Sequence, residues 1–378
     1  MREAIKQPKA LKNDTEGKRT SPLPLLDLGP AEVPEELNRT LAGWGEKPYR
    51  ARQVLRQIYQ RGVLDFRRMT DLSATLRERL ARAYDIQPLT SEAPVVSKDG
   101  TRKTLWHLEN GGAVESVVIP MERGHSTVCL STQTGCALKC AFCATGRLGA
   151  GRNLTPGEIL FQALAPLEEL PGGPVRDTSA ADKSRSLNYV IMGMGEPFLN
   201  YDNLAVALRV MNHNDFMQVG ARRITVSTVG LPEGMLRFSR DFPQMRLAVS
   251  LHAATEELRR RLMPVAHRVP LSSLLKTCRE VFGITGRRIT FEYVVLSGIN
   301  DREEDVAALA GLTRDLPCKI NLIGFNRVPG IEFNSPDKRQ LENFRYRLLA
   351  ACKQAVTLRQ SRGADIAGGC GQLAAGKS

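Results

Sequence analysis

The spacing of apolar residues changes along the chain, and the first change separates a polar tail from a helical segment. Residues 1–28 are polar, contain proline and show no hydrophobic period, which predicts disorder. From Pro34 to about Tyr84, apolar side chains recur every three or four residues, the period of an amphipathic helix. Glycine and proline interrupt this run at Gly43, Gly45, Pro48 and Gly62. The pattern therefore predicts a small module of several short helices.

A β-hairpin and then a repeating strand–helix pattern follow. Residues 101–108 and 113–119 flank Asn110-Gly111-Gly112, which predicts the hairpin. Further along, strands are expected at 126–132, 188–194, 223–229, 246–251, 288–296 and 319–325. Helices are expected near 156–169, 202–212, 256–262, 272–282, 302–314 and 337–352. This alternation is typical of parallel βα units, so we expect an α/β fold, either an open or closed barrel or a doubly wound sheet. Residues 171–186 interrupt one unit and predict a flexible surface insertion.

The charge favours a polyanionic partner. The chain carries 53 Lys and Arg against 40 Asp and Glu, a net charge of +13, which favours RNA or DNA over an acidic small molecule. The helical module holds many of the arginines: Arg50, Arg52, Arg56, Arg61, Arg67, Arg68, Arg77 and Arg79. They could contact RNA phosphates or form an ordinary solvated helix face, and the sequence leaves both open. With no long apolar run and no secretory signal, we expect a cytoplasmic protein without membrane association.

Three of the 8 cysteines, Cys136, Cys140 and Cys143, form a CxxxCxxC motif directly after a strand. Thiolates suit iron–sulfur clusters or zinc. Three cysteines can hold a cuboidal [4Fe-4S] cluster and leave its fourth iron open to a further ligand. The alternative is structural zinc with His125 or Cys129 as fourth ligand, although zinc knuckles favour paired CxxC units and the chain has no second pair.

The motif, its preceding strand and the aromatic Phe142 resemble the radical S-adenosylmethionine (SAM) superfamily. That resemblance implies that SAM binds the open iron and is cleaved to a 5′-deoxyadenosyl radical. Gly195 and Glu196, at a strand end, resemble the loop that holds the SAM amino group. Contacts to the SAM carboxylate, ribose and adenine are implied at the ends of the following strands, from Ser227, Ser250, Leu251, His252 and Asn326.

Two further cysteines lie outside the motif. Cys129 lies seven residues before Cys136, and Cys370 lies in the glycine-rich stretch GADIAGGCGQL. The flanking Gly368, Gly369 and Gly371 predict mobile backbone around a thiol that packs against nothing. Cys278, Cys318 and Cys352 are interpreted as inert buried thiols.

From about residue 35 to 375 the chain resembles one family, the dual-specificity 23S rRNA/tRNA adenine-C2 methyltransferases. The resemblance rests on GVLDFRRMTDLS, STQTGCALKCAFCATG, MGMGEPFLNYDN, VSTVG, AVSLHA, FEYVVLSGIND and the CGQL tail. It implies a partial (β/α)6 radical-SAM barrel with a helical accessory domain and a β-hairpin extension. The expected units are a disordered tail (1–28), an RNA-contacting helical domain (29–90), the hairpin extension (91–120), the radical-SAM core (121–355) and a C-terminal tail carrying Cys370 (356–378).

The family's chemistry gives both outlying cysteines a role. Adenine C2 has no lone pair and cannot attack a SAM methyl group directly. The resemblance implies that Cys370 takes a methyl group from one SAM, and that a second SAM supplies the radical that activates this methyl for addition to C2. Cys129 then forms a disulfide with Cys370 and releases the RNA, and a thioredoxin-like reductant resets the pair. Glu115 matches the family's proton acceptor, although an outward-facing surface glutamate is the alternative.

The resemblance also implies partners: 23S rRNA near the peptidyl transferase centre, tRNA anticodon loops, and a flavodoxin-like electron donor, with the chain acting as a monomer. Two other functions remain open from the sequence. One is the sister activity that methylates adenine C8, which shares the cluster and both cysteines. The other is a non-catalytic RNA-binding protein with structural zinc.

Overall fold

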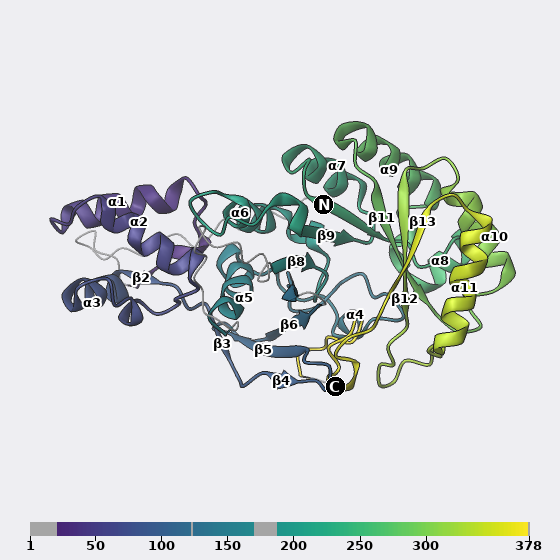
Figure 1. Ribbon diagram of the computed structural model, residues 1–378, viewed down its shortest axis with the longest axis horizontal. Helices are drawn as coiled ribbons and strands as arrows, with labels where there is room; N and C mark the ends of the chain where they lie inside the picture. Colours follow the sequence, from purple (N-terminus) through teal and green to yellow (C-terminus); the bar gives the residue numbers. More distant parts are fainter. Residues whose placement is uncertain (1–20, 122–123, 170–186, 377–378) are drawn as a thin grey trace.

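The computed structural model describes residues 21–121, 124–169 and 187–376 (Figure 1). The predicted disorder of residues 1–20 and the predicted insertion at 171–186 lie outside the described residues. Short helices of the N-terminal part lie at one end of the molecule, and a twisted sheet with its covering helices forms the rest (Figure 1). No helix of the described residues is long and apolar enough to cross a membrane.

The N-terminal part is helical, as predicted. It consists of α1 (Glu32–Gly43), α2 (Tyr49–Leu55), a π turn (Arg56–Gln60), a 3-10 turn (Phe66–Arg68) and α3 (Ala74–Ala83). The Ser73 side chain accepts a hydrogen bond from the Leu76 N–H and so caps the start of α3. The predicted apolar stripe is buried, at Leu37, Leu41, Val54, Ile58, Tyr59, Leu72, Leu76 and Leu80.

The predicted disorder was wrong for residues 21–28. Strand β1 (Leu23–Pro24) pairs in parallel with β2 (Tyr84–Asp85), and Leu25–Asp27 form a 3-10 turn. Leu25 and Leu26 are buried, and Asp27 Oδ1 accepts a hydrogen bond from the Gly157 N–H (2.8 Å). Residues 21–28 are ordered because they contact residues far along the chain. A local hydrophobic period does not reveal such contacts.

The described residues form an eleven-stranded sheet, ordered β13-β12-β11-β10-β9-β8-β7-β6-β5-β3 with β4 beside β5. Seven strands are parallel and follow sequence order: β7 (Ser126–Cys129), β8 (Leu187–Ile191), β9 (Ile224–Thr228), β10 (Arg246–Ser250), β11 (Ile289–Val295), β12 (Cys318–Gly324) and β13 (Ala355–Arg359). The antiparallel part is β3 (Leu89–Ser91), β4 (Val95–Val96), β5 (Arg102–Leu108) and β6 (Ala113–Pro120). The hairpin β5–β6 is confirmed, and β6 pairs with β7, so the hairpin extends the parallel sheet.

The six predicted helices occur where the pattern places them, and the described residues add two more, the short α4 (Ala144–Arg147) and α7 (Pro232–Asp241). The six are α5 (Pro156–Glu169), α6 (Tyr201–Asn212), α8 (Glu256–Leu262), α9 (Leu271–Thr285), α10 (Glu303–Thr313) and α11 (Lys338–Ala351). The sequence pattern also missed β13. Strand β13 lies at the sheet edge with Ala355 and Thr357 exposed, so it lacks the apolar run of a central strand.

Candidate active site

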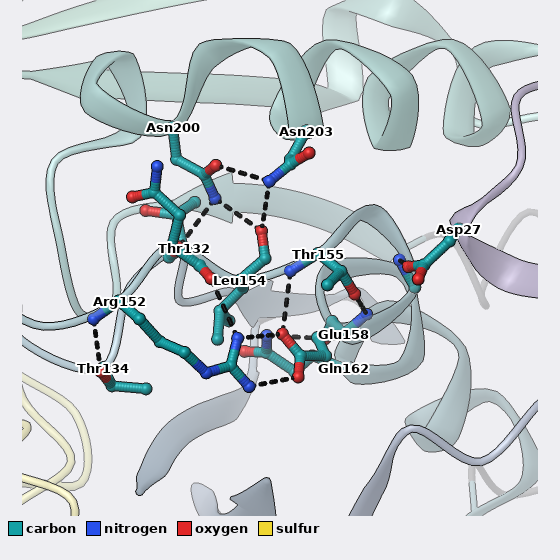
Figure 2. Close-up of polar contacts among 12 residues, drawn as sticks. Asp27, Thr132, Thr134, Arg152, Leu154, Thr155, Glu158, Gln162, Asn200 and Asn203 are labelled. Atoms are coloured by element: carbon teal, nitrogen blue, oxygen red, sulfur yellow. Dashed lines mark hydrogen bonds and ion pairs between the residues drawn. The ribbon is translucent and has the colours of Figure 1, made fainter. Parts of the chain in front are cut away.

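The loop between β7 and the three cysteines is fixed by side chains from two other elements (Figure 2). Asn200 Nδ2 donates to the carbonyl oxygens of Thr132 (2.9 Å) and Leu154 (2.8 Å). The Arg152 N–H donates to Thr134 Oγ1 (2.9 Å), and the Arg152 guanidinium binds Glu158 at the start of α5. Because the carbonyl oxygens of Thr132 and Leu154 each accept a hydrogen bond, the loop has a defined path before Cys136.

Glycine is required in this loop because there is no room for a side chain. A Cβ on Gly151 would lie 2.1 Å from the Gly135 nitrogen, and one on Gly135 would lie 2.5 Å from the Gly149 carbonyl oxygen. A Cβ on Gly146 would lie 3.1 Å from Lys139 Cα. Glycine at these positions allows two backbone segments to touch.

The three motif cysteines line one cavity of about 150 Å³ at the carboxyl ends of the parallel strands. Burial raises the pKa of Cys136 to about 11, and burial with Cys143 and Cys136 nearby raises the pKa of Cys140 further. Thiols in such a place ionise only when a positive centre compensates them, as an iron–sulfur cluster does.

The donor set fits a cluster better than a single ion. A [4Fe-4S] cluster needs three cysteines from the protein, and three line this cavity. Structural zinc needs a fourth ligand, and the two candidates, His125 and Cys129, line a different cavity.

Five of the residues predicted to bind SAM line the same cavity as the three cysteines: Gly195, Glu196, Ser227, Ser250 and His252. Glu196 is buried, and its carboxylate accepts hydrogen bonds from Thr228 Oγ1 (2.7 Å), the Val229 N–H (2.9 Å) and the Phe198 N–H (3.2 Å). Burial nevertheless raises its pKa to about 7. No cation offsets its charge within the described residues, so the carboxylate is suited to an incoming amino group.

His252 is held as a neutral ring. Its backbone has a positive φ of 56°, and its Nδ1 accepts a hydrogen bond from the Val294 N–H (3.0 Å). Its ring packs edge-on against Phe142, with centroids 4.7 Å apart. Burial and the nearby Arg259 lower the pKa of His252 to about 3. The ring therefore offers a neutral N–H to a ligand in the cavity.

Two predicted SAM contacts lie elsewhere. The Leu251 side chain is fully buried and lines neither of the cavities described here, while its N–H donates to the Glu292 carbonyl (3.0 Å). Asn326 lines a second, larger cavity, and its Nδ2 donates to the Cys370 carbonyl (3.1 Å). A SAM role for these two side chains stays a prediction.

The larger cavity, about 710 Å³, brings Cys129 and Cys370 together. The two cavities are adjacent and share lining residues, which are Cys143, Met192, Gly193, Ile323, Arg359, Cys370 and Gly371. Cys129 lies at the end of β7, where burial and the nearby Cys370 raise its pKa to about 12. Two cysteines 241 positions apart thus face one space next to the three-cysteine motif.

Arg359, which the sequence analysis did not single out, lines both cavities at the end of β13. Cys370, Glu292 and Cys129 all lie close enough to raise the pKa of its guanidinium. Its Nη1 contacts Met192 Sδ at 3.5 Å. A fixed cation at this place stabilises thiolates at either cysteine. The sequence signal was weak, since an arginine after an edge strand is common on protein surfaces.

Arg259 was also missed, although its helix gave a signal. It is fully buried, and its guanidinium donates to the Val229 (2.8 Å) and Val269 (3.1 Å) carbonyls. Residue 259 shares the buried face of α8 with Leu258 and Leu262, so only one of three successive arginines lies on that face. Burial lowers the pKa of Arg259, which lies near Cys140 and His252.

The prediction that Cys370 packs against nothing was wrong, because its segment is hydrogen-bonded to the core. The Ala144 N–H donates to the Gly371 carbonyl (2.8 Å), and Thr145 Oγ1 donates to the Leu373 carbonyl (2.7 Å). Gln372 Nε2 donates to the Arg327 carbonyl (2.8 Å). Cys370 itself is partly buried against the main hydrophobic core. The glycines give the segment a tight path across α4, visible beneath the sheet in Figure 1.

Glu115 is not an outward-facing surface residue. It lies on β6 with its side chain 2% exposed, and it lines neither cavity. Its Oε1 lies 2.9 Å from Lys103 Nζ, and its Oε2 accepts hydrogen bonds from the Ala374 (2.8 Å) and Ala375 (3.1 Å) N–H groups. Of the three cysteines interpreted as buried thiols, Cys278 and Cys318 are buried, whereas Cys352 is partly exposed.

Comparison with known proteins finds two family matches and several similar proteins. Residues 25–86 match the family model of the ribosomal RNA large subunit methyltransferase N-terminal domain, and residues 130–310 match that of the radical SAM superfamily. The dual-specificity RNA methyltransferase RlmN of Geobacter sulfurreducens is 46% identical over 90% of this chain and 89% of its own length. RlmN 2 of Myxococcus xanthus is 42% identical, over 94% of each chain. The crystal structure of a radical SAM methyltransferase from Sphaerobacter thermophilus is 41% identical and superposes with a TM-score of 0.84, covering 94% of this chain and 100% of that one.

Proposed function

The chain belongs to the RlmN family of radical SAM dual-specificity RNA methyltransferases, and from that membership we propose that it methylates C2 of an adenine in 23S rRNA and in tRNA anticodon loops. One observation carries the proposal. Cys129 and Cys370, the two cysteines that such a reaction needs outside the cluster, line one cavity that adjoins the cavity of the three motif cysteines, and Cys370 lines both.

The superfamily implies an iron–sulfur cluster and SAM. Cys136, Cys140 and Cys143 would hold the cluster, and Glu196 would accept a hydrogen bond from the SAM amino group. Ser227, Ser250 and His252 offer polar groups to the rest of the molecule. When bound, cluster and SAM supply the 5′-deoxyadenosyl radical that removes a hydrogen atom from a methyl group. Two SAM molecules are used per turnover, one for this purpose and one as methyl donor.

The two thiols outside the motif carry the methyl group and release the product. The Cys370 thiolate attacks the methyl carbon of one SAM, forming a methyl thioether and releasing S-adenosylhomocysteine, and Arg359 stabilises that thiolate. After the carbon of this group, now CH2, has bonded to C2, the adduct loses the C2 proton and returns one electron to the electron carrier, and the Cys129 thiolate attacks the Cys370 sulfur. A sulfur–sulfur bond forms and the sulfur–carbon bond breaks; the departing carbon keeps the bonding pair and takes a proton, so methylated RNA leaves. A thioredoxin-like dithiol then reduces the disulfide.

The larger cavity suits an unstacked base. Its volume of about 710 Å³ is ample for one adenine with its ribose, which must leave the RNA stack to reach Cys370. The net charge of +13 supports phosphate contacts along the approach. The proposal further includes a cytoplasmic monomer, a flavodoxin-like electron donor and Asn326 and Leu251 as further SAM contacts.

The proton acceptor is the least supported part of the proposal. The family resemblance assigns Glu115 to this step, but in this structure Lys103 and two backbone amides occupy its carboxylate. This carboxylate already binds three donors and lies outside both cavities. It is therefore placed for a task other than accepting the C2 proton.

The decisive experiment is nucleoside mass spectrometry of 23S rRNA and tRNA incubated with the cluster-loaded enzyme, SAM and a reductant. We expect 2-methyladenosine with the natural chain. With Cys370→Ala we expect at least a thousandfold loss, while slow SAM cleavage continues because the cluster is untouched. An 8-methyladenosine product would assign the chain to the C8 activity instead, and full methylation by Cys370→Ala would remove that thiol from the mechanism.

A further inference from the structure

One buried carboxylate joins the segment carrying Cys370 to the β-hairpin. Glu115 Oε2 accepts hydrogen bonds from the N–H groups of Ala374 and Ala375, at 2.8 and 3.1 Å. The same side chain binds Lys103 Nζ through its other oxygen, at 2.9 Å. Glu115 lies on β6 and Lys103 on β5, so the pair is built into the paired strands of the hairpin.

The pair holds the segment on both sides of Cys370. Lys103 Nζ also donates to the Ala367 carbonyl (3.4 Å), ahead of Cys370, while Glu115 holds Ala374 and Ala375 behind it. The Lys103 side chain is 12% exposed, and Leu373 and Ala374 are buried as well. These contacts are therefore formed largely away from water, where a charge-assisted hydrogen bond is stronger than at the surface.

The backbone amides of the segment are the natural partners of this carboxylate. Without them, Glu115 would be a buried carboxylate balanced by Lys103 alone, with one oxygen lacking donors, which is unfavourable. The two N–H groups are successive in the chain and donate to the same carboxylate oxygen. The hairpin and the segment thus satisfy each other's polar groups only when the segment is docked.

We propose that the Lys103–Glu115 pair is a clamp that docks residues 367–375 and so positions the Cys370 thiol at the junction of the two cavities. Glu115 and Lys103 are then positioning residues. This inference rests on the proposed function only in taking Cys370 as the reacting thiol. While the segment is docked, Glu115 faces the segment and lies outside both cavities, so clamping and accepting the C2 proton belong to different states of the chain.

Hydrogen–deuterium exchange on the cluster-loaded enzyme tests the clamp directly. Glu115→Ala should speed exchange at Ala374 and Ala375 at least tenfold. Glu115→Gln should have a smaller effect, because its carboxamide oxygen still accepts from the amides. Glu304→Gln, which changes an exposed partner of Arg302 on α10, is the matched control and should leave this exchange unchanged. Natural protection of the two amides in Glu115→Ala would overturn the proposal.

A second pair of measurements guards against misfolding. Ala374→Pro removes one clamped N–H without altering either charged residue, and it should expose the neighbouring amide of Ala375 as Glu115→Ala does. Peptides from β11 report whether the fold is intact in each variant. If Ala374→Pro keeps Ala375 fully protected with β11 intact, the clamp is wrong.

The half-reaction separates clamping from proton removal. The rate at which SAM methylates Cys370, followed by peptide mass before RNA is added, includes no step at adenine C2. The clamp predicts at least a tenfold slower rate for Glu115→Ala and Ala374→Pro, with Glu115→Gln partly rescued and KM for SAM unchanged. A pure proton-acceptor role predicts natural rates for all three. If the clamp passes these tests in an enzyme that methylates no adenine, the proposed function fails and the clamp stands.

Discussion

At the scale of single residues, the site is defined by charges that the fold leaves uncompensated. Glu196 is buried and accepts three hydrogen bonds from neutral donors, yet burial still raises its pKa to about 7. For an acid, a raised pKa in the folded state means that its charge costs stability as the pH rises from about 4.5 through 7. Under the proposed function, the amino group of a bound SAM would reverse that cost.

Glu196→Gln should therefore weaken SAM binding to the cluster-loaded enzyme by about 10- to 100-fold at pH 8, the loss of one charge-assisted hydrogen bond. Because the natural carboxyl is mostly neutral at pH 6 and mostly charged at pH 8, the difference in affinity between the two proteins should grow as the pH rises. Isothermal titration calorimetry at both pH values measures this, and Glu233→Gln, in the first turn of α7, serves as control. Equal affinities at pH 8 would contradict the assignment.

At the scale of elements, the cluster motif is held by two loops that touch where both have glycine and therefore no side chain. The segment after β7 and the segment before α5 touch at Gly135 and Gly151, and Asn200 from the turn before α6 binds both through Thr132 and Leu154 (Figure 2). The bond from Gly157 to Asp27 ties the start of α5 to the N-terminal part as well. The position of the motif thus depends on contacts between three elements rather than on its own sequence.

Gly151→Ala should prevent this crossing, since its Cβ would lie 2.1 Å from the Gly135 nitrogen. We expect at least a twofold fall in iron and sulfide bound after anaerobic reconstitution, because the motif cysteines are displaced. Gly283→Ala is the control: it lies inside α9 with nothing within 4 Å of the added Cβ, and it should raise stability by about 0.5–1 kcal/mol. Full iron content in Gly151→Ala would show that the crossing tolerates a side chain.

At the scale of the whole molecule, positive charge is spread unevenly between free and paired arginines. In the helical module Arg52 and Arg56 are exposed one turn apart at the end of α2. Arg67 and Arg68 are equally exposed but bind Glu78 and Glu168. Among the described residues Arg52 and Arg56 have no ion pair, so of these two pairs only they can give their full charge to an RNA phosphate without first leaving an acidic partner.

Replacing both Arg52 and Arg56 by glutamine should lower RNA affinity several-fold at low salt. It should also reduce the slope of log K against log salt by about 1 to 2, because each phosphate that an arginine neutralises contributes about 1 to that slope. The matched double variant at Arg67 and Arg68 should change both quantities less. Fluorescence anisotropy with a tRNA anticodon stem-loop over a salt series measures them, and identical slopes for the two double variants would exclude the helical module as a phosphate-binding surface.

Much of this molecule was determined by sequence alone. Alternating apolar runs and helical periods predicted six of the seven parallel strands, the hairpin and the helical module, because burial on one face leaves a local period of two or 3.6 residues. The CxxxCxxC spacing predicted three cysteines in one cavity, because eight consecutive residues cannot separate far. Five of the seven SAM contacts predicted from family motifs at strand ends line the cavity of the motif cysteines, since parallel strands place their carboxyl ends at one edge.

The tertiary structure alone decided how distant segments meet. Strand β13 gains its partner from β12, and residues 23–24 gain theirs from 84–85, so neither shows a strong local pattern. The order of the Cys370 segment depends on Glu115, Lys103 and Thr145, which come from elements more than 200 residues away. Glycines around Cys370 suggested mobility because local sequence reports the freedom of the unfolded chain. The folded chain restricts that freedom through partners that no local pattern contains.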